Sequence, residues 1–137
     1  MRWKATNSEI ATFALRGQAV FVVEDEPVIA MDLAAILFDA GASVVGPCGE
    51  ADECLELARS AAISIAVLDV RIGRQSVAPV AEALEQRGIP FLFYSGQVET
   101  DAVRKAWPEA TFVPKPAPTR RLVSALAALG GRAAAVP

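Results

Sequence analysis

Short apolar runs alternate with stretches of helical periodicity along this chain. The run Ala19–Val23 is apolar throughout and ends in the acidic triplet Glu24-Asp25-Glu26. Such a run is typical of a strand buried on both faces, as in a parallel sheet. From Pro27 to Gly41, apolar residues recur at helical spacing, and the proline suits a first turn while the glycine suits a C-cap. The pattern therefore begins with a strand, an acidic turn and a helix.

The same alternation continues toward the C-terminus. Further strands are predicted at Ser43–Gly46, Ile63–Leu68, Ile89–Tyr94 and Thr111–Val113, and further helices at Ala51–Ala61, Val77–Gln86, Glu99–Trp107 and Thr119–Leu129. The glycine-containing stretch Arg71–Ser76 is predicted to be a loop, and Gly130-Gly131 is predicted to end the last helix. Alternating strands and helices favour right-handed crossovers and one parallel sheet with helices on both faces. The expected fold class is α/β.

Length and composition fit one folded domain. The chain has 137 residues, of which 53% are hydrophobic, enough to bury a core without disulfides or metals. We divide it into an N-terminal extension over residues 1–17, a domain over 18–130 and a flexible tail over 131–137. In the extension, Ile10, Phe13 and Leu15 are expected to form a helical turn that packs on the domain or on a second copy, which allows a homodimer.

Charge and residue usage exclude several function classes. The net charge is −3 and no basic stripe is present, so nucleic-acid binding is not expected. The chain has no histidine, which rules out a phosphohistidine and a Ser-His-Asp triad. Its two cysteines, Cys48 and Cys54, are expected to be reduced thiols. No apolar run reaches membrane-spanning length, and no signal peptide is evident, so the expected location is the cytoplasm.

Polar residues follow four of the predicted strands. Glu24 and Asp25 follow the first strand, Asp69 the third, Ser95 the fourth and Lys115 the fifth. The carboxyl ends of parallel strands share one edge of a sheet, where ligands bind in open α/β folds. One polar residue after a strand is ordinary: an acidic residue could favour a helix N-terminus, and a serine could serve a turn. The combination predicts a functional site at this edge.

This set of side chains suits phosphoryl transfer. Carboxylates held close together repel, and a hard dication such as Mg²⁺ relieves the repulsion because it prefers oxygen ligands. A lysine and a hydroxyl can neutralise and bind the oxygens of a phosphoryl group. The acceptor would be a carboxylate nucleophile, and Asp69 is the best candidate because it ends a central strand.

In the order of these polar residues after the predicted strands, the sequence resembles the receiver domains of response regulators. The stretches that carry the resemblance are Val22-Val23-Glu24-Asp25-Glu26, Ala66-Val67-Leu68-Asp69-Val70, Phe93-Tyr94-Ser95-Gly96 and Val113-Pro114-Lys115-Pro116. The resemblance covers roughly Gln18 to Leu129. It implies a flavodoxin-like, chemotaxis-receiver-like fold, with five parallel strands in the order 2-1-3-4-5. The stretch Pro90–Gly96 further resembles a subgroup of stand-alone receivers with a Pro-Phe-x-Phe-x-Thr-Gly signature, common in alphaproteobacteria and paired with an atypical class of histidine kinase.

The resemblance also implies roles for the acidic residues. Asp69 would accept a phosphoryl group from the phosphohistidine of a sensor kinase. Asp25 would bind Mg²⁺, and Glu24 would do so directly or through water. Asp69 and the backbone carbonyl of Arg71 would complete the protein ligands of the metal.

Other positions would bind the phosphoryl oxygens or change conformation on phosphorylation. Ser95 and Lys115 would contact the phosphoryl oxygens, and Phe112 matches the aromatic switch position. The bond between Lys115 and Pro116 matches one that is usually cis in the family. Phe112 has no hydroxyl, so switching would act by packing alone; Pro114 is a further departure from the pattern.

The sequence leaves several functions open. The favoured one is a single-domain response regulator that is no enzyme in the usual sense and signals through an unidentified downstream protein. A phosphate sink and a non-phosphorylated docking scaffold are alternatives. A phosphatase of the haloacid-dehalogenase type is less favoured, because that family has a second aspartate two residues after the nucleophile, where this chain has Arg71.

Overall fold

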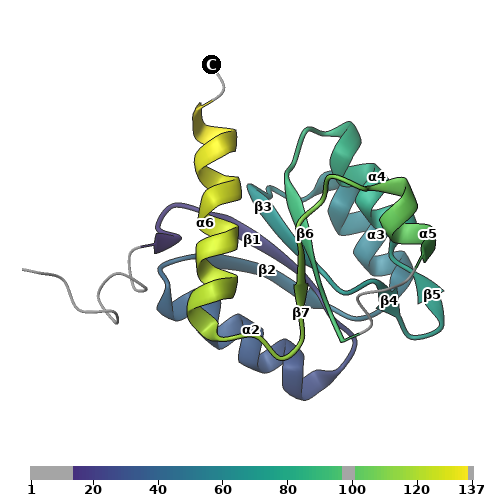
Figure 1. Ribbon diagram of the computed structural model, residues 1–137, viewed down its shortest axis with the longest axis horizontal. Coiled ribbons are helices and arrows are strands. Elements are labelled where there is room, and N and C mark those ends of the chain that lie inside the picture. The colour runs from purple at the N-terminus through teal and green to yellow at the C-terminus, as the bar shows by residue number, and fades with distance from the viewer. Residues whose placement is uncertain (1–13, 97–100, 136–137) are drawn as a thin grey trace, which may run out of the picture.

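The computed structural model describes residues 14–96 and 101–135 of the chain. Within this part, strands and helices alternate as the sequence predicts (Figure 1). The elements are β1 (Ala19–Val23), α2 (Pro27–Asp39), β2 (Ser43–Cys48), α3 (Ala51–Ser60), β3 (Ile65–Leu68), β4 (Arg71–Ile72), β5 (Gln75–Ser76), α4 (Ala78–Gln86), β6 (Phe91–Ser95), α5 (Asp101–Ala106), β7 (Phe112–Pro114) and α6 (Thr119–Ala135).

The main sheet of the described residues has five parallel strands in the order β2-β1-β3-β6-β7. Numbered along the chain, these strands have the predicted order 2-1-3-4-5, which is confirmed. Figure 1 shows α2 and α6 on one face of the sheet and α3, α4 and α5 on the other. The central strands β1 and β3 are therefore covered on both faces, which explains why their sequences are apolar without alternation.

Each face of the sheet contributes its own half of the core. Along β1, Val20 and Val22 pack toward α2 and α6, whereas Phe21 and Val23 pack toward α3 and α4. Both cysteines are free and buried in the second of these clusters, as expected for reduced thiols. Burial raises the pKa of the Cys54 thiol far above its ordinary value, and the neighbouring Cys48 raises it further. The two cysteine side chains therefore form part of the hydrophobic core.

Two elements differ from the sequence prediction. The stretch predicted as a loop, Arg71–Ser76, forms the antiparallel hairpin β4–β5. The last helix does not end at Leu129 but runs through Gly130-Gly131 to Ala135. That prediction of the helix end was wrong, because the Arg132-Ala133-Ala134-Ala135 stretch supplies strong helix formers beyond the two glycines.

The predicted N-terminal extension is described only from residue 14 onward. Its predicted turn at Ile10 and Phe13, like the first part of the helix predicted at Glu99–Trp107, lies outside the described residues. Leu15 is fully buried, and its N–H donates a hydrogen bond of 2.9 Å to the carbonyl of Ala40. None of the helices among the described residues has the length and apolar character needed to cross a membrane.

Candidate functional site

The loop after β1 carries two adjacent carboxylates. Glu24 is buried, and its N–H donates to the carbonyl of Cys48 at 2.9 Å, which fixes the loop against the end of β2. The Oε2 atom of Glu24 accepts the N–H of Glu26 at 3.2 Å. Asp25 is exposed and extends from the same loop. The end of β1 thus presents one buried and one solvent-facing carboxylate.

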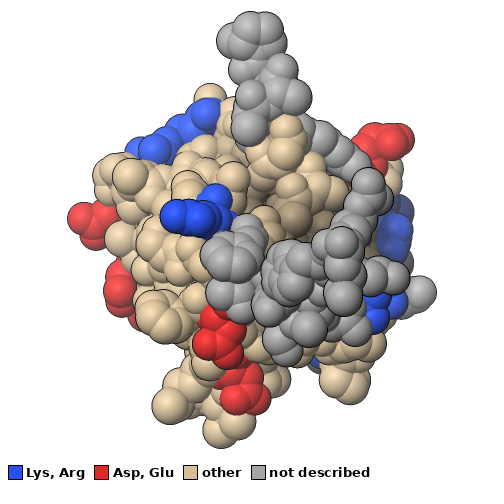
Figure 2. Space-filling model, turned by 90° about the vertical axis from the view of Figure 1, so that its left-hand side faces the viewer, with Lys and Arg blue, Asp and Glu red and all other residues tan. Residues whose placement is uncertain are grey.

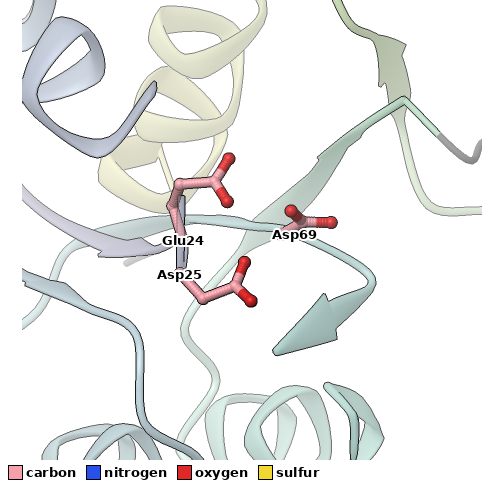
Figure 3. A group of neighbouring side chains, drawn as sticks. All are labelled: Glu24, Asp25 and Asp69. Carbon is pink, nitrogen blue, oxygen red and sulfur yellow. The ribbon is translucent and has the colours of Figure 1, made fainter. Parts of the chain in front are cut away.

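Asp69 follows β3, the strand next to β1 in the sheet. Its N–H donates to the carbonyl of Val23 at 3.0 Å, so the pairing of β1 and β3 continues to the edge. Figure 3 shows the Glu24 and Asp25 side chains extending from their loop toward Asp69. Oxygen atoms from these three carboxylates lie within 4.8 Å of one another. The parallel register therefore brings together the three carboxylates, as the sequence predicts.

Lys115 joins this group from the end of β7. Its ammonium donates to Oδ2 of Asp69 at 3.0 Å and also to Oε1 of Glu24. The following peptide bond, to Pro116, is cis, as the resemblance implied. One ammonium therefore bridges carboxylates from two different strand ends.

The pKa values of the buried groups reflect a crowded acidic site. Burial raises the pKa of Glu24, and the nearby Asp69 carboxylate raises it further, while hydrogen bonds from Lys115 and Glu26 oppose the change. Burial by itself lowers the pKa of Lys115, but its hydrogen bonds to Glu24 and Asp69 outweigh this and raise it. The ammonium is therefore held charged, and the cluster retains unneutralised negative charge.

The donor set fits a hard divalent cation. The three carboxylates carry a charge of −3 when ionised, and Lys115 supplies +1, which leaves −2. A dication would neutralise this remainder. Mg²⁺ takes oxygen ligands, and each of the three residues offers a carboxylate oxygen within 4.8 Å of the others. The chemistry of the donor set therefore fits Mg²⁺.

The hairpin β4–β5 contributes a contact that sequence reasoning missed. The N–H of Gly73 donates to Oδ2 of Asp25 at 2.7 Å. Gly73 has φ +62° at the first position of a two-residue turn, a conformation that favours glycine. The sequence feature that could have predicted this hairpin is the Gly73-Arg74 turn between two short segments that pair. The hairpin therefore holds the more exposed carboxylate in place.

Ser95 and Arg71 border an opening beside the carboxylates. A cleft of about 220 Å³ is lined by Asp25, Asp69, Arg71, Gly73, Ser95 and Gly96. The N–H of Lys115 donates to the carbonyl of Ser95 at 3.1 Å, so the ends of β6 and β7 are fixed to each other. The N–H of Arg71 donates to Oδ1 of Asp69 at 3.4 Å. The cleft is large enough for a small anionic group beside Asp69.

Phe112 lies outside this cleft, within an aromatic cluster on β6 and β7. Its ring stacks on Phe93 with 4.8 Å between ring centroids, and the Arg104 guanidinium lies 4.2 Å from its centroid. The half-buried ring is thus held between a core aromatic residue and a cation from α5. The structure does not bring Phe112 into contact with the carboxylates.

Comparison with known proteins identifies the family. Residues 20–127 match the response regulator receiver domain. The chain belongs to this family. The receiver is also 31% identical over 88 residues to the transcriptional regulatory protein PdtaR of Mycobacterium tuberculosis. That match covers 64% of the receiver but only 43% of PdtaR, so the receiver spans less than half of this relative.

Solved structures show the same fold. The receiver is similar to a response regulator receiver protein from Sinorhizobium medicae, with a TM-score of 0.75 at 22% identity, covering 85% of this chain and 96% of the other. It is also similar to the receiver domain of the sensor histidine kinase PA1611 from Pseudomonas aeruginosa, with a TM-score of 0.72 at 17% identity over 84% and 98% of the two chains. The structure of that domain has a magnesium ion coordinated in the active-site cleft.

Proposed function

We propose that this receiver accepts one phosphoryl group on Asp69 from a sensor histidine kinase, in a reaction that requires Mg²⁺. The observation that carries the proposal is the convergence of Glu24, Asp25 and Asp69 within 4.8 Å, with Lys115 bonded to two of them. A carboxylate oxygen of Asp69 would form the new P–O bond as the P–N bond of the donor phosphohistidine breaks. The phosphorylated protein would be the signalling state, without turnover of a substrate.

Each neighbouring residue has a role in this proposal. Glu24, Asp25, Asp69 and the backbone carbonyl of Arg71 would hold Mg²⁺, which when bound offsets charge on the phosphoryl group. The magnesium ion in the related PA1611 domain supports this assignment. The ammonium of Lys115 and the hydroxyl of Ser95 would bind the phosphoryl oxygens. Lys115 would exchange its contact with Oδ2 of Asp69 for one with the incoming group.

Phosphorylation of Asp69 would change the surface of the protein through the packing of neighbouring side chains. Phosphorylation adds close to two negative charges beside Ser95, whose strand also carries Phe93. Because Phe112 stacks on Phe93, a movement of β6 would change the surface formed by α5, β7 and α6. A nearly complete switch needs roughly 5.5 kcal/mol of differential stabilisation. A downstream protein that binds the phosphorylated form would supply part of it.

The remaining features of the proposal concern partners and location. The resemblance of Pro90–Gly96 to the Pro-Phe-x-Phe-x-Thr-Gly subgroup supports a kinase of the atypical class. Figure 2 shows Lys and Arg in separate groups on one face of the molecule, which fits a protein partner better than nucleic acid on that face. The location would be cytoplasmic, where sensor kinases present their phosphohistidine.

A small phosphodonor tests the proposal directly. The full chain is incubated with acetyl phosphate and Mg²⁺, and its intact mass is measured promptly. The wild type is expected to gain one phosphoryl group, and Asp69→Asn none. Asp32→Asn, which removes an exposed carboxylate on α2, is the matched control and should be labelled like the wild type. An unlabelled wild type under varied donor and metal concentrations would favour a docking scaffold instead.

A further inference from the structure

A tyrosine ring lies beside the lysine of the acidic site. The ammonium of Lys115 is placed over the ring of Tyr94, 5.5 Å from the ring centroid, which is within the range of a cation–π contact. The same ammonium donates to Glu24 and to Asp69. The lysine is therefore bounded by two carboxylates and by one aromatic face.

The register of the sheet explains why the ring lies there. Tyr94 and Val113 are register partners in the neighbouring strands β6 and β7, and both pack in the buried cluster on the α2–α6 side of the sheet. Side chains two residues apart along a strand lie on the same face. Lys115, two residues after Val113, therefore continues the face that carries Tyr94, whereas Ser95 lines the cleft.

The proposed reaction requires a lysine that moves over a short distance only. The ammonium would leave Oδ2 of Asp69 for an oxygen of the incoming phosphoryl group, while the buried Glu24 competes for it. A lysine side chain is flexible, and its ammonium has three rotatable donors. An aromatic face attracts a cation without offering a lone pair that would take the place of the phosphoryl oxygen. The ring can therefore hold the ammonium near Asp69 and leave its donors available.

We propose that Tyr94 is a positioning residue that holds the ammonium of Lys115 beside Asp69 through the face of its ring. This inference rests on the proposed phosphorylation of Asp69 and adds a residue to it. Tyr94 acts through Lys115, and it acts through its ring and not through its hydroxyl. The variant Tyr94→Phe therefore keeps the contact, whereas Tyr94→Leu removes it and still fills the strand with an apolar side chain.

The contact can be tested without phosphorylation, because Tyr94 is the only tyrosine of the chain. In the full chain made with isotope-labelled tyrosine, the ring signals in NMR spectra belong to this residue alone. Lys115→Met removes the ammonium and keeps an apolar stem, so it should move these signals. Lys105→Met, an exposed change on α5, should leave them in place. Ring signals that ignore the change at Lys115 would overturn the proposal.

The positioning role is tested by the rate at which acetyl phosphate labels the full chain at saturating Mg²⁺. We expect Tyr94→Leu to slow labelling by about 3–10-fold, which is the strength of a partly desolvated cation–π contact expressed as a rate. Tyr94→Phe should restore most of the wild-type rate. Phe91→Leu is the matched structural control, because Phe91 is another half-buried aromatic residue of β6 but begins the strand, away from the site. It should lower the thermal midpoint without slowing labelling.

A double-mutant cycle shows whether the ring acts through the lysine. Lys115→Met should slow labelling, and the addition of Tyr94→Leu should slow it no further. Independent slowing by the two changes, or equal rates for the wild type and Tyr94→Leu, would overturn this inference alone. A wild type that takes up no phosphoryl group would instead overturn the proposed function, and the positioning role with it.

Discussion

At the level of single residues, the site depends on one lysine shared by two carboxylates. Lys115 contacts Glu24 and Asp69 together, so neither carboxylate is fully neutralised. Burial raises the pKa of Glu24, and the neighbouring Asp69 carboxylate raises it further. A site with this imbalance has a physical reason to bind a cation, since the cation removes repulsion that already exists.

The acidic loop also depends on a residue without a side chain. A Cβ on Gly49 would lie 2.9 Å from Cα of Asp25 and 3.1 Å from the carbonyl oxygen of Glu24. Both are backbone atoms, so relief requires movement of the acidic loop. We therefore expect Gly49→Ala to weaken Mg²⁺ binding by about 10–100-fold, the usual cost of disturbing groups that support metal ligands. Isothermal titration of the folded variant with Mg²⁺ measures this. An affinity equal to that of the wild type would contradict it.

The sequence predicts the residues of the site better than their contacts. Glu24, Asp25 and Asp69 could be grouped because parallel strands end at a common edge. The contact between Gly73 and Asp25 could not be predicted in the same way, because it depends on how the hairpin folds over the loop. The roles of these residues in phosphoryl transfer stay predictions until the labelling experiment is done.

At the level of elements, apolar runs predicted the five strands of the main sheet. They did not predict the short hairpin β4–β5 or the glycine-containing end of α6. The hairpin β4–β5 has two residues in each strand, too few for an alternation to show. The end of α6 was predicted too early because a glycine within a helix costs only about 1 kcal/mol relative to alanine. Burial of Leu126 and Leu129 on the same helix helps to offset that cost.

The length of α6 gives a test at this scale. Gly131 is exposed and lies within the helix, and a Cβ added there would meet no neighbouring side chain or element within 4 Å. Gly131→Ala should therefore raise the free energy of unfolding by about 0.5–1 kcal/mol, measured by urea denaturation. Gly17 also has open space around it, but its φ is +82°. Gly17→Ala should destabilise the protein instead. No effect of the Gly131 change would indicate that the helix ends earlier.

At the level of the whole molecule, the fold joins its two halves at the functional edge. The α2–α6 face and the α3–α5 face each have their own buried cluster, with the sheet between them. The acidic loop follows β1, an inner strand of that sheet, and Lys115 follows the edge strand β7. A ligand that binds these groups therefore ties together segments far apart in the sequence. Such a ligand should stabilise the native state as a whole.

Mg²⁺ should accordingly raise the free energy of unfolding of the entire domain. A ligand that binds only the native state adds about 2.7 kcal/mol at a concentration one hundred times its Kd. Urea denaturation with Mg²⁺, and with Na⁺ at equal ionic strength, measures the difference. We expect Asp25→Asn to lose most of the increment, because it removes a proposed ligand and one negative charge.

The matched change Asp32→Asn separates the two effects of that substitution. Asp32 is exposed on α2, outside the carboxylate group, so its replacement makes the net charge less negative by the same amount without touching the site. The Asp32→Asn protein should keep the full Mg²⁺ increment. Both Asn variants can change stability without metal, since each removes a negative charge from an acidic protein, so only the increment is compared. If the Mg²⁺ increment survives Asp25→Asn unchanged, the cation binds elsewhere on the molecule. The excess negative charge of the three carboxylates would then not be what attracts it.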